Sequence, residues 1–295
     1  MQLRRPVICA VDTSADALQA ARSAARFAEQ TRAPLLLVHA VAHGADADAH
    51  GHGAAVLRDL THDLDAEVRP RTMLVVGDPA GAVLEAARTT DAAALFLGAR
   101  GSGRSHRFLL GATAAAVTAH APCPVVLTPD ASADVVDLAG GTIVHGIVDG
   151  ATNGTAHVAD LARRLASELV LVHVYGPRTV VDPYDPDARA RCDTAASARR
   201  LLELIAAGID VPARLVTERA TGTMAGVLTR IADEVDAACV SVSARPQGPL
   251  TSALTGSATT GLAASGRPVL VVPSGAAARA LDEPPRAAAA QVAQA

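Results

Sequence analysis

Short apolar runs alternate with longer stretches of helical periodicity along the first half of the chain. The apolar runs, which we predict to be strands, lie at residues 7–12, 35–41, 72–79, 94–101 and 124–129. The predicted helices are 15–32, 81–90, a stretch after the polar loop that follows the second strand, and a stretch before the last strand. Strands that alternate with helices indicate βαβ units, a parallel sheet and right-handed crossovers.

The second half of the chain repeats this order. Its predicted strands lie at 142–149, 169–175, 213–218, 238–246 and 268–273, and its predicted helices lie at 156–167, 224–235 and before the last strand. A repeat of this length indicates duplicated domains, because solenoid periods are only about 20–50 residues. The sequence therefore predicts an α/β fold with two doubly wound, Rossmann-like parallel-sheet domains in tandem, at residues 1–130 and 142–273.

The polar stretch 130–141 is the predicted boundary between the two domains. Residues 274–295 form a tail rich in Ala, Pro and Gln that has few large apolar side chains. Because such a tail buries too little apolar surface to offset its ordering entropy, we expect it to be disordered. A short Ala-rich helix is the alternative.

Composition narrows the cellular setting and the partners. Half of the 295 residues are hydrophobic but only 2% are aromatic, so we expect cores built from Ala, Val, Leu and Ile. A net charge of -4 without a basic block argues against a nucleic-acid partner. No apolar run reaches the length of about 18 residues that a membrane span needs, and no signal-peptide core follows Met1. Four widely spaced cysteines do not indicate disulfides, so we predict a cytoplasmic protein.

The candidate ligand site lies where the predicted strands end, because open α/β sheets bind ligands outside the carboxyl ends of their strands. Asp12 closes the first strand, and the loop that begins Gly98, Ala99, Arg100, Gly101 closes the fourth. Glycines and the start of a helix form an arrangement that binds phosphate. The loop lacks the lysine of a P-loop and does not follow the first strand, as a dinucleotide fingerprint does.

The spacing of Gly98, Gly101 and Gly111 resembles the G-x2-G-x9-G-[S/T] signature of ATP-binding universal stress proteins. The runs VICAVD, LLLVHAV, VVGDPAGAVLEAA and AHAPCPVVLTP are also similar to that family, and the resemblance covers residues 6–273. It implies a five-stranded parallel sheet in each domain, an adenine nucleotide at the switch point, and pairing of the domains through their last strands.

The resemblance also implies roles for individual residues. It assigns Asp12 to adenine recognition and Ala40 to an apolar position near the base. The implied ribose and phosphate contacts come from Gly98, Arg100, Gly101, Gly111, Ala112 and Thr113. Ala112 stands where the family has Ser or Thr, so the choice among ATP, ADP and AMP, and the presence of Mg²⁺, stay open.

The second domain departs further from the signature. Ser243 and Pro246 stand where the first domain has glycines, whereas Asp149, Gly256 and Ser257 are retained. Proline removes a backbone donor and fixes φ, which reshapes a phosphate cradle. We therefore expect weak or no nucleotide binding at this degenerate second site, and a structural or regulatory role for the domain.

Other interpretations compete with these assignments. Asp12 could cap the following helix instead of contacting a ligand. The loop 42–53 contains His43, Asp46, Asp48, His50 and His52, but zinc or nickel ligands need a rigid scaffold and this stretch looks flexible, so we predict no metal site. His39 and His173 recur at equivalent strand positions, which favours packing or hydrogen bonding over acid–base catalysis.

The sequence thus favours a stress-response sensor or regulator that binds one ATP-class nucleotide in its first domain. No nucleophile elbow or general-base pair stands out, so we predict no catalytic residues and, at most, a weak ATPase. A slow ATP hydrolase and a nucleotide-free dimerisation scaffold are the alternative functions. The expected protein partners are a second copy of the chain, as a homodimer, and an unidentified client.

Overall fold

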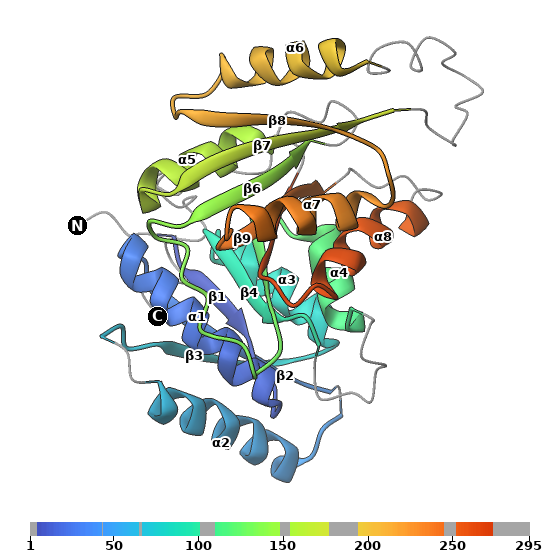
Figure 1. Cartoon of the computed structure of the whole chain (residues 1–295). Coiled ribbons are helices and arrows are strands. Elements are labelled where there is room, and N and C mark those ends of the chain that lie inside the picture. Colours follow the sequence, from blue (N-terminus) through green and yellow to red (C-terminus); the bar gives the residue numbers. More distant parts are fainter. Residues whose placement is uncertain are drawn as a thin grey trace.

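The computed structural model describes residues 5–42, 44–64, 67–100, 110–147, 154–176, 194–244 and 252–273 (Figure 1). The elements of the first domain are β1 (Val7–Ala10), α1 (Ala15–Thr31), β2 (Leu35–Val41), α2 (Ala47–Asp63), β3 (Arg71–Val76), α3 (Pro79–Thr89), β4 (Ala94–Gly98), α4 (Ala112–His120) and β5 (Val125–Thr128). Those of the second domain are β6 (Thr142–Ile147), α5 (Thr155–Leu165), β7 (Glu168–Tyr175), α6 (Ala195–Ala206), β8 (Ala213–Arg219), α7 (Met224–Glu234), β9 (Cys239–Ala244), α8 (Ser252–Ala263) and β10 (Val269–Pro273).

The described strands form one ten-stranded sheet in the order β3-β2-β1-β4-β5-β10-β9-β6-β7-β8. Strands within each domain pair in parallel, whereas β5 and β10 pair antiparallel, with Val126 opposite Leu270. The predicted α/β architecture and the predicted pairing of the two last strands are both confirmed. Because both strands pair within the chain, each domain covers an edge that would otherwise be open.

Helices cover both faces of this sheet (Figure 1). The core on one face includes side chains from α1, α2, α5 and α6, and the core on the other includes α3, α4, α7 and α8. Alanines on α1, such as Ala20, Ala21 and Ala24, are fully buried and let that helix lie close to the strands. Phe27 and Phe96 form an aromatic pair with ring centroids 5.2 Å apart. The cores are otherwise aliphatic, as the composition predicts.

The connection between the domains is packed along α1 rather than looping through solvent. We call residues 131–138 the strap. Gln19 Nε2 donates to the carbonyl of Ala133 at 2.8 Å, and Ser23 Oγ accepts from the amide of Val136 at 3.1 Å. Val136 and Leu138 are buried, with exposed fractions of 5% and 1%. Two residues of the polar stretch that we predicted as a boundary, Val136 and Leu138, are therefore part of the core.

Two predictions about secondary structure need correction. Helix α2 begins at Ala47, inside the stretch 42–53 that we expected to be a flexible loop. Asp46 caps it by accepting from the amide of Ala49, and Gly53 packs so closely that an added Cβ would lie 2.7 Å from Leu74 Cδ1. The tertiary contact therefore stabilises a helix of poor intrinsic propensity.

Helix α6, between β7 and β8, was not predicted. Thr194 caps it by accepting from the amide of Ser197 at 3.1 Å, and Ala198, Leu202 and Ile205 form its buried stripe. This spacing of apolar residues was a usable helix signal in the sequence. The predicted tail, residues 274–295, lies outside the described residues.

The described cysteines are free and buried. Burial raises the pKa of the Cys123 and Cys239 thiols to about 12, which keeps them protonated. Such thiols act as small apolar side chains. Among the described helices, none is both long and apolar enough to cross a bilayer.

Candidate functional site

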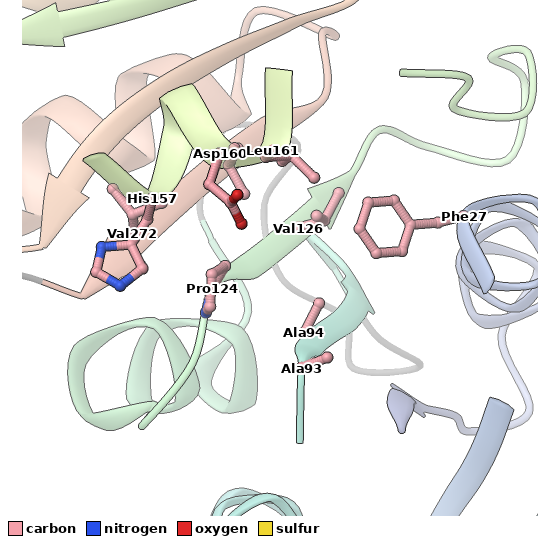
Figure 2. Close-up of a pocket in the computed structure, with 10 residues that line it drawn as sticks. Phe27, Ala93, Ala94, Pro124, Val126, His157, Asp160, Leu161 and Val272 are labelled. Atoms are coloured by element: carbon pink, nitrogen blue, oxygen red, sulfur yellow. The ribbon is translucent and has the colours of Figure 1, made fainter. Parts of the chain in front are cut away.

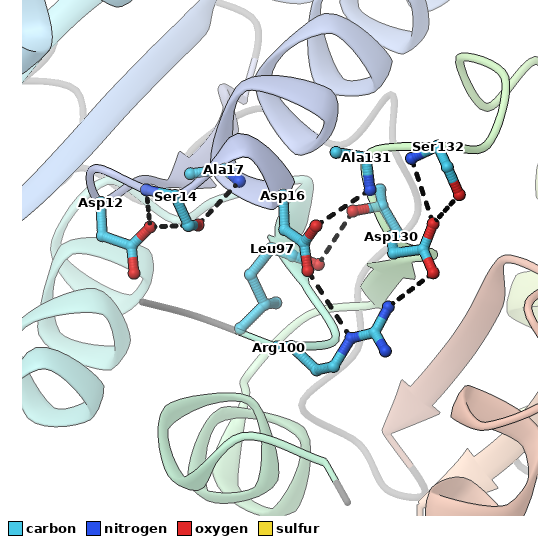
Figure 3. Close-up of polar contacts among 10 residues, drawn as sticks. Asp12, Ser14, Asp16, Ala17, Leu97, Arg100, Asp130, Ala131 and Ser132 are labelled. Atoms are coloured by element: carbon cyan, nitrogen blue, oxygen red, sulfur yellow. Dashed lines mark hydrogen bonds and ion pairs between the residues drawn. The ribbon is translucent and has the colours of Figure 1, made fainter. Parts of the chain in front are cut away.

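The carboxyl ends of β1 and β4 lie side by side at the switch point of the first domain, because β1 pairs with both β2 and β4. Asp12 follows β1 there and is partly buried. Its Oδ1 accepts from the amide of Ser14 at 2.9 Å and from the Ser14 hydroxyl (Figure 3). Ser14, in turn, caps α1 by accepting from the amide of Ala17 at 3.1 Å. The residue that caps α1 is thus Ser14, and Asp12 orients the cap.

Gly98 ends β4 in a place without room for a side chain. A Cβ on this residue would lie 2.8 Å from the Arg100 carbonyl oxygen and 3.1 Å from Asp16 Cβ. The glycine that we predicted from a ligand signature is therefore also required by the packing of the loop against α1. A larger residue at this position would disturb the fold as well as any ligand.

Arg100 follows β4 on the same loop, and its side chain is paired with carboxylates. Nη2 lies 2.8 Å from Asp130 Oδ2, and Nε lies 3.7 Å from Asp16 Oδ2 (Figure 3). Hydrogen bonds from Ser132, together with Arg100, hold the pKa of Asp130 below its usual range. The predicted phosphate contact of Arg100 thus competes with two acidic partners that the sequence pattern did not reveal.

Helix α4 starts directly beside this loop. Gly111 is its N-cap residue and makes no side-chain capping bond, while its amide donates to the Ala99 carbonyl at 2.9 Å. Ala112 is exposed and Thr113 is partly buried. A helix start without a capping side chain presents amide donors and partial positive charge, which favours an anion. Gly101 lies outside the described residues.

The predicted strand histidines have a repeated structural role. His39 Nδ1 forms a hydrogen bond with the Val11 carbonyl at 2.8 Å, and His173 Nδ1 forms one with the Ile147 carbonyl at 3.0 Å. This confirms the hydrogen-bonding role that we predicted for the pair. Ala40, next to His39, pairs with Val75 of β3 and is partly exposed at the end of β2.

The degenerate second site is built differently. Ser243 is the second-last residue of β9, and its hydroxyl lies against Gly154, the N-cap residue of α5, in contact range of a Cβ added there. Ile147 takes the place of Val11 next to the strand histidine, so Asp149 comes one residue later than Asp12 does. Asp149 and Pro246 lie outside the described residues. Gly256 and Ser257 lie in α8, where the Ser257 side chain is not among the described ones.

Sequence reasoning missed a buried polar cluster in the second domain. His145 Nδ1 lies 3.0 Å from Ser241 Oγ, and Thr155 Oγ1 lies 3.3 Å from His145 Nε2. Each of these residues is at most 1% exposed, and burial lowers the pKa of His145 to about 4. The imidazole is therefore neutral at pH 7. A histidine and a serine inside apolar strands were the signal that could have revealed this cluster.

Two other features carry no ligand chemistry. Among the described residues, no group of three or more His, Cys, Asp or Glu side chains could hold a metal ion. A cavity of about 20 Å³ lies where β5 meets β10, between Phe27, Val126 and Leu161, with His157 and Asp160 beside it (Figure 2). It holds no more than about one water molecule and lies away from the candidate site.

Comparisons with known proteins place the chain in a family. The sequence model of the universal stress protein family matches it twice, at residues 4–129 and 143–273. Universal stress protein Rv2623 of Mycobacterium tuberculosis H37Rv is 30% identical over 188 residues, which cover 57% of this chain and 63% of that protein. A protein of strain CDC 1551, universal stress protein MT2698, matches to the same extent.

Solved structures agree on the fold. A universal stress protein from Archaeoglobus fulgidus superimposes with a TM-score of 0.69 at 17% identity, over 93% of this chain and 98% of that one. A protein described as a putative universal stress protein from Pseudomonas aeruginosa gives a TM-score of 0.59 at 16% identity, over 99% and 97% of the two chains. With the family model matching in both halves, the chain belongs to the universal stress protein family, in its tandem two-domain form.

Proposed function

We propose that the first domain binds an adenine nucleotide and that the protein acts as a nucleotide-dependent regulator in the stress response. The observation that carries this proposal is the placement of Asp12 and the start of α4 at the same switch point. Asp12 is held by Ser14, so its carboxylate is oriented before a ligand arrives. A fixed carboxylate accepts hydrogen bonds from nucleoside donors at a low entropic cost.

The phosphate end of the ligand belongs at α4. Small residues, Gly111 and Ala112, begin that helix, and within the described part of the chain no side chain caps it. Backbone amides at a helix start bind phosphate without sequence-specific side chains. Because Ala112 lacks a hydroxyl, we expect similar affinities for ATP, ADP and AMP, with Mg²⁺ contributing little.

The second domain is not part of the proposed nucleotide site. The Ser243 hydroxyl is buried against Gly154 and finds no hydrogen-bond partner among the residues that the structure describes. A buried hydroxyl in this position narrows the gap between the end of β9 and the start of α5. One nucleotide per chain is therefore the expected stoichiometry.

The test is mass spectrometry of the nucleotide released on denaturation, with calorimetric titration of the emptied protein. Asp12→Asn keeps an oxygen that can hold Ser14 but removes the charge, so we expect at least a tenfold loss of affinity. Asp46→Asn makes the same chemical change at the N-cap of α2, a residue outside the proposed set of nucleotide contacts, and serves as the matched control.

Equal affinity in wild type, Asp12→Asn and Asp46→Asn would contradict the site. A protein that carries no nucleotide and shows no thermal shift with ATP would contradict nucleotide binding altogether, because a ligand of the folded state must raise stability. ATP turnover with Mg²⁺ that Asp12→Asn abolishes would replace the binding role with hydrolysis.

Self-association is a separate part of the proposal. Strands β5 and β10 are occupied by each other, so a homodimer needs a surface other than these last strands. Sedimentation equilibrium with and without ATP measures whether such a dimer forms. A monomer at all concentrations would remove the homodimer from the proposal.

A further inference from the structure

Arg100 connects the phosphate end of the proposed site to the start of the strap. Its backbone follows Ala99, whose carbonyl accepts from the Gly111 amide at the start of α4. Its side chain runs to the opposite side of the loop, towards Asp16 and Asp130 (Figure 3). Arg100 therefore lies between two features: the start of α4, which favours an anion, and the carboxylates of Asp16 and Asp130.

The same two carboxylates hold the first residues of the strap. Asp16 Oδ1 accepts from the amide of Ala131 at 2.9 Å. Asp130 Oδ1 accepts from the amide of Ser132 at 3.1 Å and from its hydroxyl. The Arg100 guanidinium offsets part of the negative charge that both carboxylates bring to this point. A change in the position of its guanidinium would leave two adjacent acids without their cation.

The strap connects this point of attachment to the second domain. Along α1 it is held by Gln19 and Ser23, and Arg26 lies 3.0 Å from Asp137. At its far end the Leu138 carbonyl accepts from the hydroxyl of Ser167, the residue that leads into β7. Side-chain contacts therefore tie the strap to α1 along its length and to Ser167 of the second domain at its far end.

We propose that the Arg100–Asp130 ion pair is a latch that a nucleotide phosphate opens, which loosens the start of the strap when the first domain is occupied. This inference rests on the nucleotide site proposed above. Arginine binds phosphate oxygens as well as carboxylates, and a phosphate at α4 competes for the same guanidinium. The side chains of Arg100 and Asp130 are 29% and 47% exposed, so their pair contributes little net stability and can exchange partners.

The latch is a feature of the first domain alone. In the repeat, Pro273 takes the place of Pro129, and the residue that follows it is Ser274 where the first domain has Asp130. No carboxylate is therefore supplied at that point of the second domain. Occupancy of one site, and not of two, would control the strap.

The test is hydrogen–deuterium exchange of the full chain, read on peptides that cover residues 129–138, with calorimetry to report ATP binding. In the wild type we expect saturating ATP to speed amide exchange at 131–133 about tenfold, since two capping carboxylates lose their cation. Asp130→Asn should exchange fast without ATP, show no further increase with it, and bind ATP several-fold more tightly.

Arg100→Gln should also exchange fast without ATP but bind it more weakly, because the cation itself is missing. Asp134→Asn makes the same change as Asp130→Asn at an exposed strap position, and we expect wild-type behaviour from it. Thermal melts of each variant check that the fold is retained.

Calorimetric binding of ATP without faster exchange at 131–133 would overturn the latch and leave the nucleotide site standing. Slow exchange in ligand-free Asp130→Asn would also overturn the latch, whatever ATP does. Absence of ATP binding in the wild type would overturn the proposed function and, with it, a latch that phosphate opens.

Discussion

The two domains place the same strands in the same order but fill the layer beneath the candidate site with different chemistry. In the first domain Cys9 of β1 is paired with Phe96 of β4. In the second domain the corresponding pair is His145 and Ser241. A small residue beside a large one has become a large residue beside a small one, and an apolar pair has become a polar pair. The comparison teaches that the fold requires the total volume of this layer, not its polarity.

The helices that follow the first strand of each domain, α1 and α5, also differ. Both end in a residue with left-handed backbone, Arg32 with φ of 52° and Ala166 with φ of 51°. Helix α1 has 17 residues, whereas the part of α5 that the structure describes begins at Thr155 and has 11. In the first domain Ser14 caps the helix beside the candidate site with its side chain, and within the described residues Gly154 makes no such bond at α5.

The largest expected difference concerns two arginines that hold equivalent turns. Arg5 is 2% exposed and donates to the carbonyls of Asp91 and Ala92 at 2.9 Å each. Arg267 is 24% exposed and donates to the Ala237 carbonyl. Urea unfolding should show a loss of about 3–5 kcal/mol for Arg5→Ala, which leaves buried acceptors unpaired. Arg267→Ala should lose only about 1 kcal/mol. Equal losses would mean that burial does not distinguish the two turns.

The next effect is the acid sensitivity of the second domain. The pKa of His145 is about 4 in the folded protein, against 6.5 for the free side chain. The unfolded state therefore binds the proton first, and stability should fall by about 3 kcal/mol as the pH drops from 6.5 to 4. Above pH 6.5 this contribution is constant.

A variant that imports the first domain's residues sharpens this prediction. His145→Cys, Ser241→Phe and Thr155→Ala together reproduce Cys9, Phe96 and Ala21 of the first domain. The triple variant should therefore lack the loss of stability at low pH that His145 causes. Unfolding free energies at pH 4.5 and 7 measure the difference. The same loss in the wild type and the triple variant would show that other groups cause it.

A smaller effect is expected where the start of α5 packs against the ends of β9 and β10 in the second domain. A Cβ at Gly154 would lie 2.6 Å from Val272 Cγ2 and against the Ser243 hydroxyl. Gly154→Ala should therefore cost about 2 kcal/mol, and Ser243→Gly in the same chain should recover about half of it. Gly81→Ala is the control, because its Cβ would make only ordinary contacts. Strictly additive effects of Gly154→Ala and Ser243→Gly would argue against their contact.

The smallest effect is expected from a substitution that restores a hydroxyl at the start of α4. Ala112→Ser gives α4 of the first domain the side chain that the second domain has in Ser257, and should raise the affinity for ATP relative to ADP about fivefold, or about 1 kcal/mol. Ala115→Ser, one turn along the same helix and also exposed, should leave the ratio unchanged. If both variants changed the ratio of ATP to ADP affinity equally, the hydroxyl at position 112 would not contact the terminal phosphate.

The sequence predicted most strands because a parallel sheet covered on both faces needs continuous apolar runs. It was less informative where helices lie at the ends of the sheet. Helix α2 contains Gly51 and Gly53, and its formation depends on contacts with β2 and β3 rather than on propensity. For α6, the spacing of Ala198, Leu202 and Ile205 along the chain is itself a helix signal, so this helix does not depend on tertiary contacts to be recognised.

The site shows the same division. Strand ends singled out Asp12 and Gly98, and the resemblance to the universal stress protein signature added Gly111. In the structure Asp12 and Gly98 lie at the ends of β1 and β4, and Gly111 bonds to Ala99, the residue after β4. Spacing could not reveal that Ser14 caps α1, or that Gly98 is needed because Asp16 lies against it. Local patterns record which residue types a loop contains, but not which side chains approach from another element.

The amino-acid sequence by itself determined the family, the tandem α/β architecture and the strand ends at which a ligand is expected. Periodicity and short motifs suffice for these because they depend on neighbours along the chain. Only the tertiary structure decided that Arg100 pairs with Asp130, that the strap is bound along α1, and that a neutral histidine lies buried in the second domain. The Arg100–Asp130 pair joins residues 30 apart in sequence, the Ser23–Val136 bond residues 113 apart and the His145–Ser241 bond residues 96 apart, and these distances and this burial exist only in the folded chain.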